Sequence, residues 1–277
     1  MAASDYEIRG ESGLCPFGVL ALGIDREATT ISIEAFQGVE PNDIVIGMGA
    51  LIGDEVVRVI DNLLPNITVA RGCADTIPQV HAASTEVWFF SEAAGSDGRE
   101  YLATDTVAVK LLPFTAASAP VPIDYAPPNE VTFNWRAFRP YAPGNLQCQG
   151  APWFQGPFTT LGGETELLFT WNHRDRLLQA DQLIGHTEGS IGPEPGTTYR
   201  IRVYDSTDTL VRSVDGITAE SWAYTDTMRA ADLPTGSGRL VLYSVRDGFE
   251  SYSQYEVLIG NGGGGGLGES LGENLGG

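Results

Sequence analysis

The stretch GALIGDEVVRV, residues 49–59, decides the fold class of this chain, because a Gly-Asp turn separates two apolar runs. β-Branched and charged residues interleave after the turn, with Val56, Val57, Val59 and Ile60 alternating among Asp54, Glu55, Arg58 and Asp61. A strand with one face toward solvent has this pattern, and IGD is a suitable turn before it. The stretch therefore predicts scaffold, with the acidic residues GDE in a solvated turn.

The same pattern recurs along the N-terminal part of the chain. Short apolar runs are separated by Gly, Pro, Asn and Asp, and no long helical periodicity occurs. The predicted strands lie in TTISIEA, EVVRVID, NITVARG, TEVWFF and TVAVKLL. We predict an all-β protein in which residues 1–118 form a small barrel or sandwich domain.

The alternating pattern within residues 151–260 predicts a second β domain. TELLFTWNH places Leu167, Phe169 and Trp171 on one face, TYRIRVYD alternates similarly, and RLVLYSVRDGFESYSQYEVLI indicates two strands joined through RDGFES. SWAYTDTMRA is a further expected strand. A Trp on an early strand followed by alternating strands at this spacing resembles the fibronectin type III sandwich.

Two segments complete the predicted organisation. Residues 119–150 are rich in Pro and aromatic residues and are interpreted as a semi-rigid linker. Residues 261–277 form a Gly-rich tail in which Leu267, Leu271 and Leu275 recur every four residues. The tail is either a flexible end or a segment ordered by docking in an assembly.

The charge of the chain limits its partners. Its 277 residues include 36 acidic and 16 basic ones, of which only Lys110 is a lysine, and the formal net charge is −20. Such a surface repels phosphate, so we expect no specific nucleic acid ligand. No apolar run approaches the roughly 18 residues of a membrane span, and the N-terminus lacks the features of a secretion signal, so a soluble protein that is not Sec-exported is expected.

No sequence motif indicates a metal, a cofactor or an enzyme. Cys15, Cys73 and Cys148 lie far apart without a C-x-x-C pair, which disfavours both zinc and a disulfide framework. P-loop, dinucleotide, G-x-S-x-G and H-E-x-x-H motifs are also missing. We therefore expect no cofactor and no catalytic residues; a hydrolase that uses an unrecognised acid pair is the third alternative.

Three clusters of reactive residues still required an interpretation. Cys73 and His81 in RGCADTIPQVHA could pair across a turn, but no third partner is evident. His173 precedes Arg174 and Asp175, and neighbours on a strand face opposite sides, so a polar cap at a strand end is expected there. The acidic run DSTD, residues 205–208, is interpreted as a solvated turn, since it lacks the ligand spacing of a calcium loop.

Aromatic residues around the linker form the candidate binding interface. They are Phe133, Trp135, Phe138, Tyr141, Trp153, Phe154 and Phe158. One interpretation is that these rings join the two domains of one chain. The other is that some of them, with Trp153 and Phe154 first, contact a neighbouring subunit or stack on a sugar.

Several motifs in order carry a resemblance to a known family. ALIGDEVVRV, ITVARGCADTIPQVHA, VKLLPFT, FRPYAPGNLQCQG and FTWNHRDR together resemble the C-terminal region of tail-tip and hub proteins of long-tailed bacteriophages and gene-transfer-agent particles. The resemblance spans roughly residues 45–255. In those proteins a large hub portion commonly precedes this region, whereas this chain begins almost at once with it, which favours a minor tail or fibre component.

The resemblance implies a function and a set of partners. It implies a non-enzymatic structural component of a phage tail tip, made in the host cytoplasm and located in the virion. The implied partners are hub, distal tail and fibre subunits, further copies of the chain, with a trimer as one form, and a host surface receptor or glycan. The alternative from another class is a receptor- or glycan-binding β-sandwich module.

Overall fold

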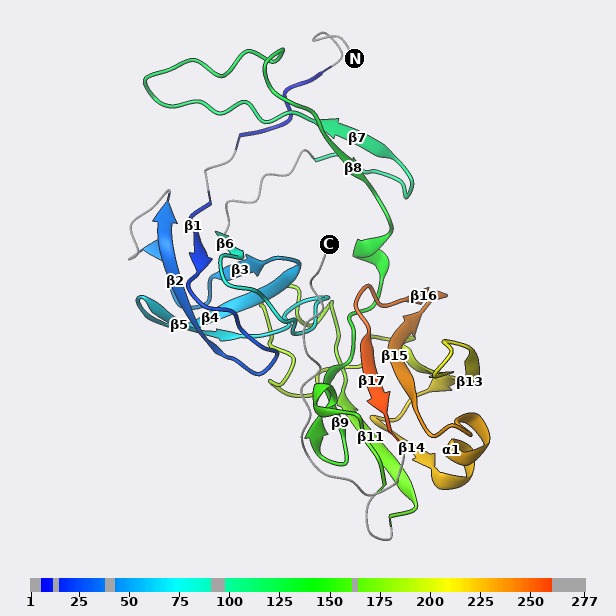
Figure 1. The fold of residues 1–277 in the computed structure, drawn as a ribbon. Coiled ribbons are helices and arrows are strands. Elements are labelled where there is room, and N and C mark those ends of the chain that lie inside the picture. Colours follow the sequence, from blue (N-terminus) through cyan, green and yellow to red (C-terminus); the bar gives the residue numbers. More distant parts are fainter. Residues whose placement is uncertain (1–5, 12–14, 38–42, 91–97, 161–163, 261–277) are drawn as a thin grey trace.

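The computed structural model is an all-β protein with two bodies and a projecting hairpin (Figure 1). It describes residues 6–11, 15–37, 43–90, 98–160 and 164–260. The all-β expectation is thereby confirmed. The Gly-rich segment 261–277, which carries the three regularly spaced leucines, lies outside the described residues.

The first body is a closed antiparallel barrel. Its strands are β1 (Phe17–Leu20), β2 (Thr30–Gln37), β3 (Gly49–Ile52), β4 (Glu55–Leu63), β5 (Asn66–Ala70) and β6 (Glu86–Phe90). They follow one another around the barrel in the order β1-β2-β5-β4-β3-β6. Closure pairs each of these described strands with a neighbour on both sides.

Alternation of side chains along the strands builds the barrel core. β3 and β4 form the hairpin predicted from GALIGDEVVRV, with Gly53 at φ 55° in the turn. Val57 and Val59 on β4 are fully buried, whereas Ile60 is exposed. Each fully buried side chain of this size contributes about 1.5–3 kcal/mol relative to its exposed state.

The second body is a two-sheet β-sandwich, as the fibronectin type III-like expectation requires. One sheet has the order β10-β9-β11-β14 and the other β13-β12-β15-β16, with β17 also paired to β15. The bounds are β9 (Gly144–Cys148), β10 (Ala151–Pro152), β11 (Glu166–Asn172), β12 (Thr198–Asp205), β13 (Leu210–Ile217), β14 (Ser221–Thr225), β15 (Gly238–Arg246), β16 (Phe249–Glu250) and β17 (Tyr255–Ile259). Trp171 of β11 packs edge-on against Tyr199 of β12 at 5.3 Å between ring centroids, so the aromatic residue that signalled the sandwich lies between its sheets.

The region expected to be a linker contains structure that belongs to the sandwich. Strand β9 lies within residues 119–150, and its Cys148 pairs with Phe169 of β11. Gly144, Leu146 and Cys148 are buried and alternate with half-buried residues, which is the strand pattern. The sandwich therefore begins before residue 151, and the Pro and aromatic composition around this short strand masked its alternation.

One expected strand ends in a helix. Within SWAYTDTMRA, β14 is followed directly by helix α1 (Asp226–Asp232). The Thr225 hydroxyl accepts a hydrogen bond from the backbone N–H of Met228 at 3.3 Å and so caps the helix. The described residues also include the 3-10 helices η3 (Arg136–Phe138) and η4 (Trp153–Gln155). Within the described residues, no helix is long and apolar enough to cross a membrane.

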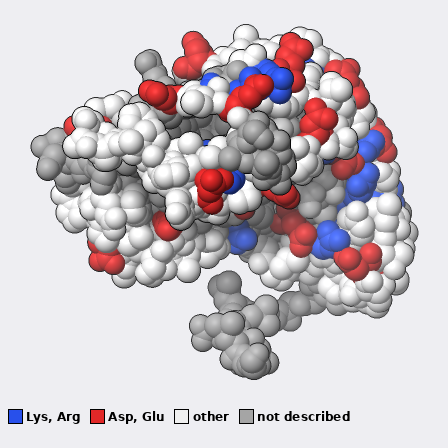
Figure 2. Space-filling view, turned by 90° about the horizontal axis from the view of Figure 1, so that it is seen from above, with Lys and Arg blue, Asp and Glu red and all other residues white. Residues whose placement is uncertain are grey.

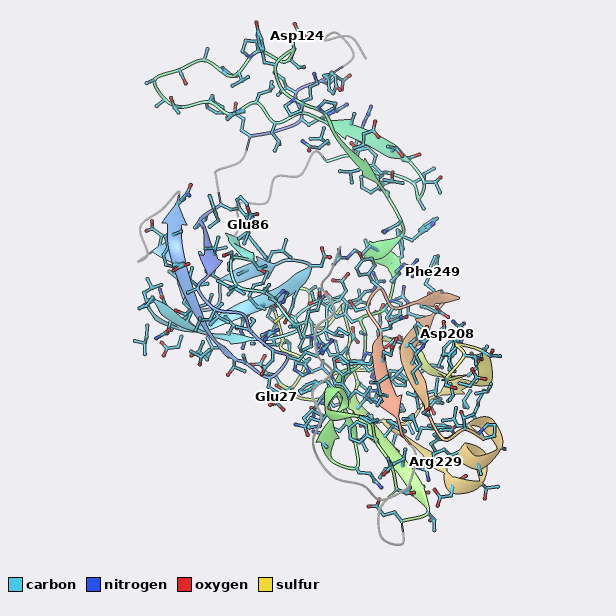
Figure 3. The ribbon with its side chains drawn as sticks, viewed as in Figure 1. Glu27, Glu86, Asp124, Asp208, Arg229 and Phe249 are labelled. Atoms are coloured by element: carbon cyan, nitrogen blue, oxygen red, sulfur yellow. The ribbon has the colours of Figure 1, made fainter. Side chains whose placement is uncertain are left out.

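A hairpin, termed the arm and comprising residues 102–133, stands away from both bodies (Figure 1). Strands β7 (Thr106–Val109) and β8 (Asn129–Thr132) pair with each other in a separate two-stranded sheet. The arm therefore crosses the expected domain boundary at residue 118. Asp124 marks its far end in Figure 3, remote from the barrel and the sandwich.

Candidate functional site

A buried carboxylate lies at the centre of the segment that opened the sequence analysis. Glu55 has no exposed surface, so the expectation that it lies in a solvated turn is wrong. The Arg71 guanidinium donates two parallel hydrogen bonds to it, at 2.7 and 2.8 Å. His81 Nε2 lies 2.9 Å from the Glu55 Oε2 atom. We call these three residues the Glu55 network.

The Glu55 network fixes the loop from Arg71 to His81 on the barrel. The backbone N–H groups of Gly72 and Gln79 donate to the two Glu55 oxygens, each at 2.9 Å. Arg71 also donates to the carbonyl oxygens of Asp25 and Ala28 on a neighbouring loop, at 2.9 and 2.7 Å. The Glu55 carboxylate thus binds the loop near both of its ends, at Arg71 and Gly72 and at Gln79 and His81.

Electrostatics keep this carboxylate ionised. Burial alone raises the pKa of Glu55, but the hydrogen bonds from Arg71 and His81 and the charge of Arg71 outweigh burial, and the net pKa is lowered. Because both lone-pair-rich oxygens are occupied by donors, the carboxylate has no open position for a substrate. The network has the chemistry of a structural support.

Cys73 is equally unsuited to catalysis. Its side chain is fully buried, and burial raises the pKa of the thiol to about 12. Its sulfur contacts the carbonyl oxygen of Ala70 at 3.6 Å, while His81 is engaged by Glu55. The thiol–imidazole pair considered from the sequence is not formed, and a thiol with a raised pKa is a poor nucleophile.

A second buried arginine, which belongs to the sandwich, forms hydrogen bonds with the same loop. Arg174, which is 3% exposed, donates to the carbonyl oxygens of Gly72 and Ala74 at 3.3 and 3.1 Å. It also donates to the carbonyl oxygen of Ile184 at 3.1 Å, and its guanidinium lies 5.8 Å from the ring centre of Tyr141. We call the loop 71–81, the Glu55 network and Arg174 together the joint.

Backbone contacts complete the joint. The N–H of His186 donates to the carbonyl oxygen of Arg71 at 2.9 Å. The carbonyl of His186 in turn approaches Gly144 so closely that a Cβ there would lie 2.7 Å from its oxygen. Glycine is therefore required at the start of β9. Burial and the nearby guanidinium of Arg174 lower the pKa of His186 to about 4, so this histidine is neutral at pH 7.

Exposed polar pairs surround the joint. Arg58 of the barrel pairs with Glu188 of the sandwich at 2.6 Å, and Arg136 donates to Asp75 at 2.9 Å. On another side, Gln155 donates to Glu27 at 2.8 Å. In Figure 3, Glu27 lies where the barrel meets the lower part of the sandwich. Such solvated contacts contribute little energy each.

A cleft of about 690 Å³ opens beside the joint. Ile77, Pro78 and Gln79 of the loop line one wall, with Arg26. Trp153, Phe154, Tyr252 and Leu258 contribute to the wall on the sandwich side. The cleft has walls from both bodies, so its shape depends on the joint.

The predicted aromatic interface residues separate into distinct places. Trp153 and Phe154 line the cleft, and Trp153, at 6% exposed, is also part of the sandwich core. Tyr141 lies at the joint, and Phe158 packs against the sandwich core. Trp135 and Phe138 are 42% and 53% exposed and contact each other. Phe133 stacks on Tyr101 at the base of the arm, so the rings do not form one cluster.

The remaining candidates have structural roles. His173 directly follows β11, and its Nδ1 shares a hydrogen bond with the Tyr199 hydroxyl, as a polar group at a strand end does. In DSTD, Asp205 accepts hydrogen bonds from the backbone of Thr207 and Thr209 at 2.8 and 3.0 Å, which confirms a turn. Over the described ranges, His, Cys, Asp and Glu side chains do not gather in any group that could hold a metal ion.

Comparison with known proteins gives little further information. No protein-family model matches the sequence, and no curated protein matches it. A solved structure described as "Biofilm associated protein - BSP domain" is 12% identical, with a TM-score of 0.24. The alignment covers 90% of this chain but only 30% of that one. At this level of similarity it carries no argument about fold or function.

Proposed function

We propose that the protein is a non-enzymatic structural component of a bacteriophage tail tip, located in the virion, that holds two β domains in one fixed orientation for neighbouring tail subunits. Its action is the placement of surfaces. Hub, distal tail and fibre subunits, together with further copies of the chain, are the proposed partners.

One observation carries this proposal. Four of the five segments on which the resemblance to tail-tip proteins rests meet at the joint, and the fifth, VKLLPFT, lies in the arm. ALIGDEVVRV supplies Glu55, ITVARGCADTIPQVHA supplies the loop 71–81, FRPYAPGNLQCQG supplies Tyr141 and Gly144, and FTWNHRDR supplies Arg174. Residues that resemble a family of assembly proteins thus serve the rigidity of this chain, which is the property a tail component needs.

Exposed apolar side chains on the arm are a second observation that supports an assembly function. Leu102, Leu111 and Phe114 of the arm are 71%, 71% and 52% exposed, and the sheet of the arm has two strands. A two-stranded hairpin is marginally stable in water by itself. Apolar side chains in such a position are suited to burial against a neighbouring subunit.

The charge distribution fits a protein that lies near DNA without binding it. On the face seen in Figure 2, acidic side chains are spread among basic ones, and they do not surround one basic patch. With a net charge of −20, the chain repels the phosphate backbone of a genome passing through the tail. Purified protein should therefore not retain duplex DNA at physiological salt.

Receptor or glycan binding is a second candidate function, and the cleft is the observation that favours it. Its volume of about 690 Å³ lies within the range of small-molecule sites, and aromatic and polar side chains share its walls. Such a function is compatible with a position at a tail tip, where a virion meets a cell surface.

Immunogold electron microscopy of purified particles tests the tail-tip proposal. An antibody raised against the sandwich should label one end of the tail, and a mutant lacking the protein should give particles with defective or missing tips. Normal particles that carry none of the protein would contradict the proposal. Measurable turnover of a polysaccharide by the purified chain would contradict its non-enzymatic part.

A further inference from the structure

Arg26 is an unneutralised cation in a strongly acidic protein. Among the described residues it takes part in no hydrogen bond or ion pair, and its guanidinium lies 5.1 Å from the ring centre of Trp153. The carboxylates on either side of it bond to other groups, each through one oxygen. Asp25 accepts from the N–H groups of Glu27 and Ala28, and Glu27 accepts from Gln155.

The wall of the cleft around Arg26 carries two donors without acceptors. Arg26 Nε and Trp153 Nε1 are both buried, and neither has a hydrogen-bond partner. Trp153 is more than nine-tenths buried. A buried donor that lacks an acceptor costs about 1–3 kcal/mol, so this wall of the cleft is polar but incompletely satisfied within the chain. The remaining guanidinium nitrogens of Arg26 can form the two-pronged contact that matches a carboxylate.

The rest of the lining matches a sugar ring. Phe154 and Tyr252 contribute aromatic surface, and Tyr252 is 45% exposed. Gln79 and Gln254 contribute amides, which can donate to and accept from hydroxyl groups. Glu256 also lines the cleft, but its carboxylate pairs with Arg239 at 3.3 Å. An alternation of aromatic faces and planar polar groups suits a ligand with apolar C–H faces and many hydroxyls.

We propose that the cleft between barrel and sandwich binds a carboxylate-bearing sugar, with Arg26 as the anchor for its carboxylate. The proposal deepens the receptor- or glycan-binding function and rests on it, while the tail-tip assembly function does not depend on it. Because loop 71–81 forms one wall, the joint holds the site in shape before the ligand arrives.

Titration with trigalacturonate tests the proposal, and its fully methyl-esterified form is the matched neutral ligand. Isothermal titration calorimetry and amide chemical shifts would be recorded on the full chain. We expect saturable binding of the acid with shifts at the cleft. The ester should bind at least about tenfold more weakly, because the ion pair with the guanidinium is lost.

Three variants locate the binding. Arg26→Gln should weaken trigalacturonate binding at least about tenfold, and Tyr252→Ala should weaken it by about threefold or more. Arg9→Gln removes an equal charge from an exposed pair with Glu7, outside the cleft, and should leave binding unchanged. Thermal unfolding of each variant establishes that it is folded.

Several outcomes would overturn the proposal. They are the absence of binding up to about 10 mM sugar, equal affinity for acid and ester, equal affinity in the Arg26→Gln variant, and shifts confined to residues outside the cleft. Sodium acetate competing at the same concentration as the trisaccharide would reduce the site to a simple anion contact and contradict a sugar site. None of these results would affect labelling of the tail tip, so the two proposals fail separately.

Discussion

The joint and the arm differ in the burial of their side chains and in the partners those side chains have. In the joint, Glu55 and Arg71 are fully or almost fully buried and are surrounded by hydrogen-bond partners. In the arm, β8 is exposed along its whole length, and Leu111 at 71% and Tyr125 at 81% exposure contact mainly solvent. The joint is stabilised by contacts within the chain, whereas the arm leaves apolar side chains exposed in the part of the chain that the structure describes.

This difference shows that buried and exposed residues are selected for different reasons. Buried charged residues depend on their partners within the fold, whereas exposed apolar residues depend on what they contact after folding. A buried ion pair is destabilising unless each charge is compensated, so the partners of Glu55 must be positioned together. An exposed apolar hairpin gains little from its own chain, so its sequence is explained by what it meets after folding. On this interpretation, the joint maintains the shape of the protein, and the arm contacts other subunits during assembly.

The largest effect should come from breaking the joint. Glu55→Ala removes the acceptor of four groups and leaves the buried Arg71 charge uncompensated, so we expect the free energy of unfolding to fall by about 3–5 kcal/mol. Chemical denaturation monitored by tryptophan fluorescence measures it. Glu34→Ala, an exposed carboxylate on β2 of the same barrel, should change the free energy by less than about 0.5 kcal/mol. Equal effects of the two substitutions would show that the Glu55 network contributes nothing.

The second-largest effect should come from acidification, which lowers the free energy of unfolding through groups in the joint. The pKa of His186 is about 4 in the folded protein, below its ordinary value of 6.5, so between these pH values the unfolded chain binds a proton that the folded chain does not. Stability is therefore complete above pH 6.5 and falls as the pH decreases toward 4, by about 2–3 kcal/mol. The lowered pKa of Glu55 adds a loss in the same direction below about pH 4.5.

A variant separates the histidine from the carboxylates. His186→Asn should flatten the dependence of the unfolding free energy between pH 6.5 and 5, where most carboxylates remain ionised. An unchanged slope in that interval would rule out His186 as its source.

The smallest effect should come from removing the arm tip. Replacing residues 110–128 by a two-residue Asn-Gly turn would join β7 to β8 directly. The thermal midpoint of the barrel and sandwich should stay within about 2 °C, because the removed segment packs on neither core. Incorporation into particles should nevertheless be lost. A large fall in midpoint would place the arm among the stabilising parts of the fold.

The sequence predicted the architecture better than the site. Alternation in EVVRV and TYRIRVYD indicated both β bodies, because period-two burial is a local property of a strand. The same alternation placed Glu55 on the face of Val57 and Val59, so its burial was available from the sequence. Its position next to Gly53 and Asp54 instead led to the interpretation as a turn.

The rest of the joint depends on contacts that no local pattern contains. Arg174 meets carbonyl oxygens of Gly72 and Ala74, about a hundred residues earlier in the chain. Backbone carbonyls carry no sequence signal, so nothing in FTWNHRDR distinguished Arg174 from its neighbour Arg176. Arg26 could not be identified from the sequence either. Its proposed role as an anchor for a ligand rests on its lack of a hydrogen-bond partner and on its position over the ring of Trp153.

Residual dipolar couplings test the central claim, that the joint fixes barrel and sandwich in one orientation. Backbone N–H couplings of residues 17–90 and 144–259 would be measured on the weakly aligned full chain and fitted for each body separately. The account predicts that both bodies report the same alignment tensor, in magnitude and direction, when fitted to the structure. Tensors of clearly different magnitude for the two bodies would mean that they move independently, and would contradict it.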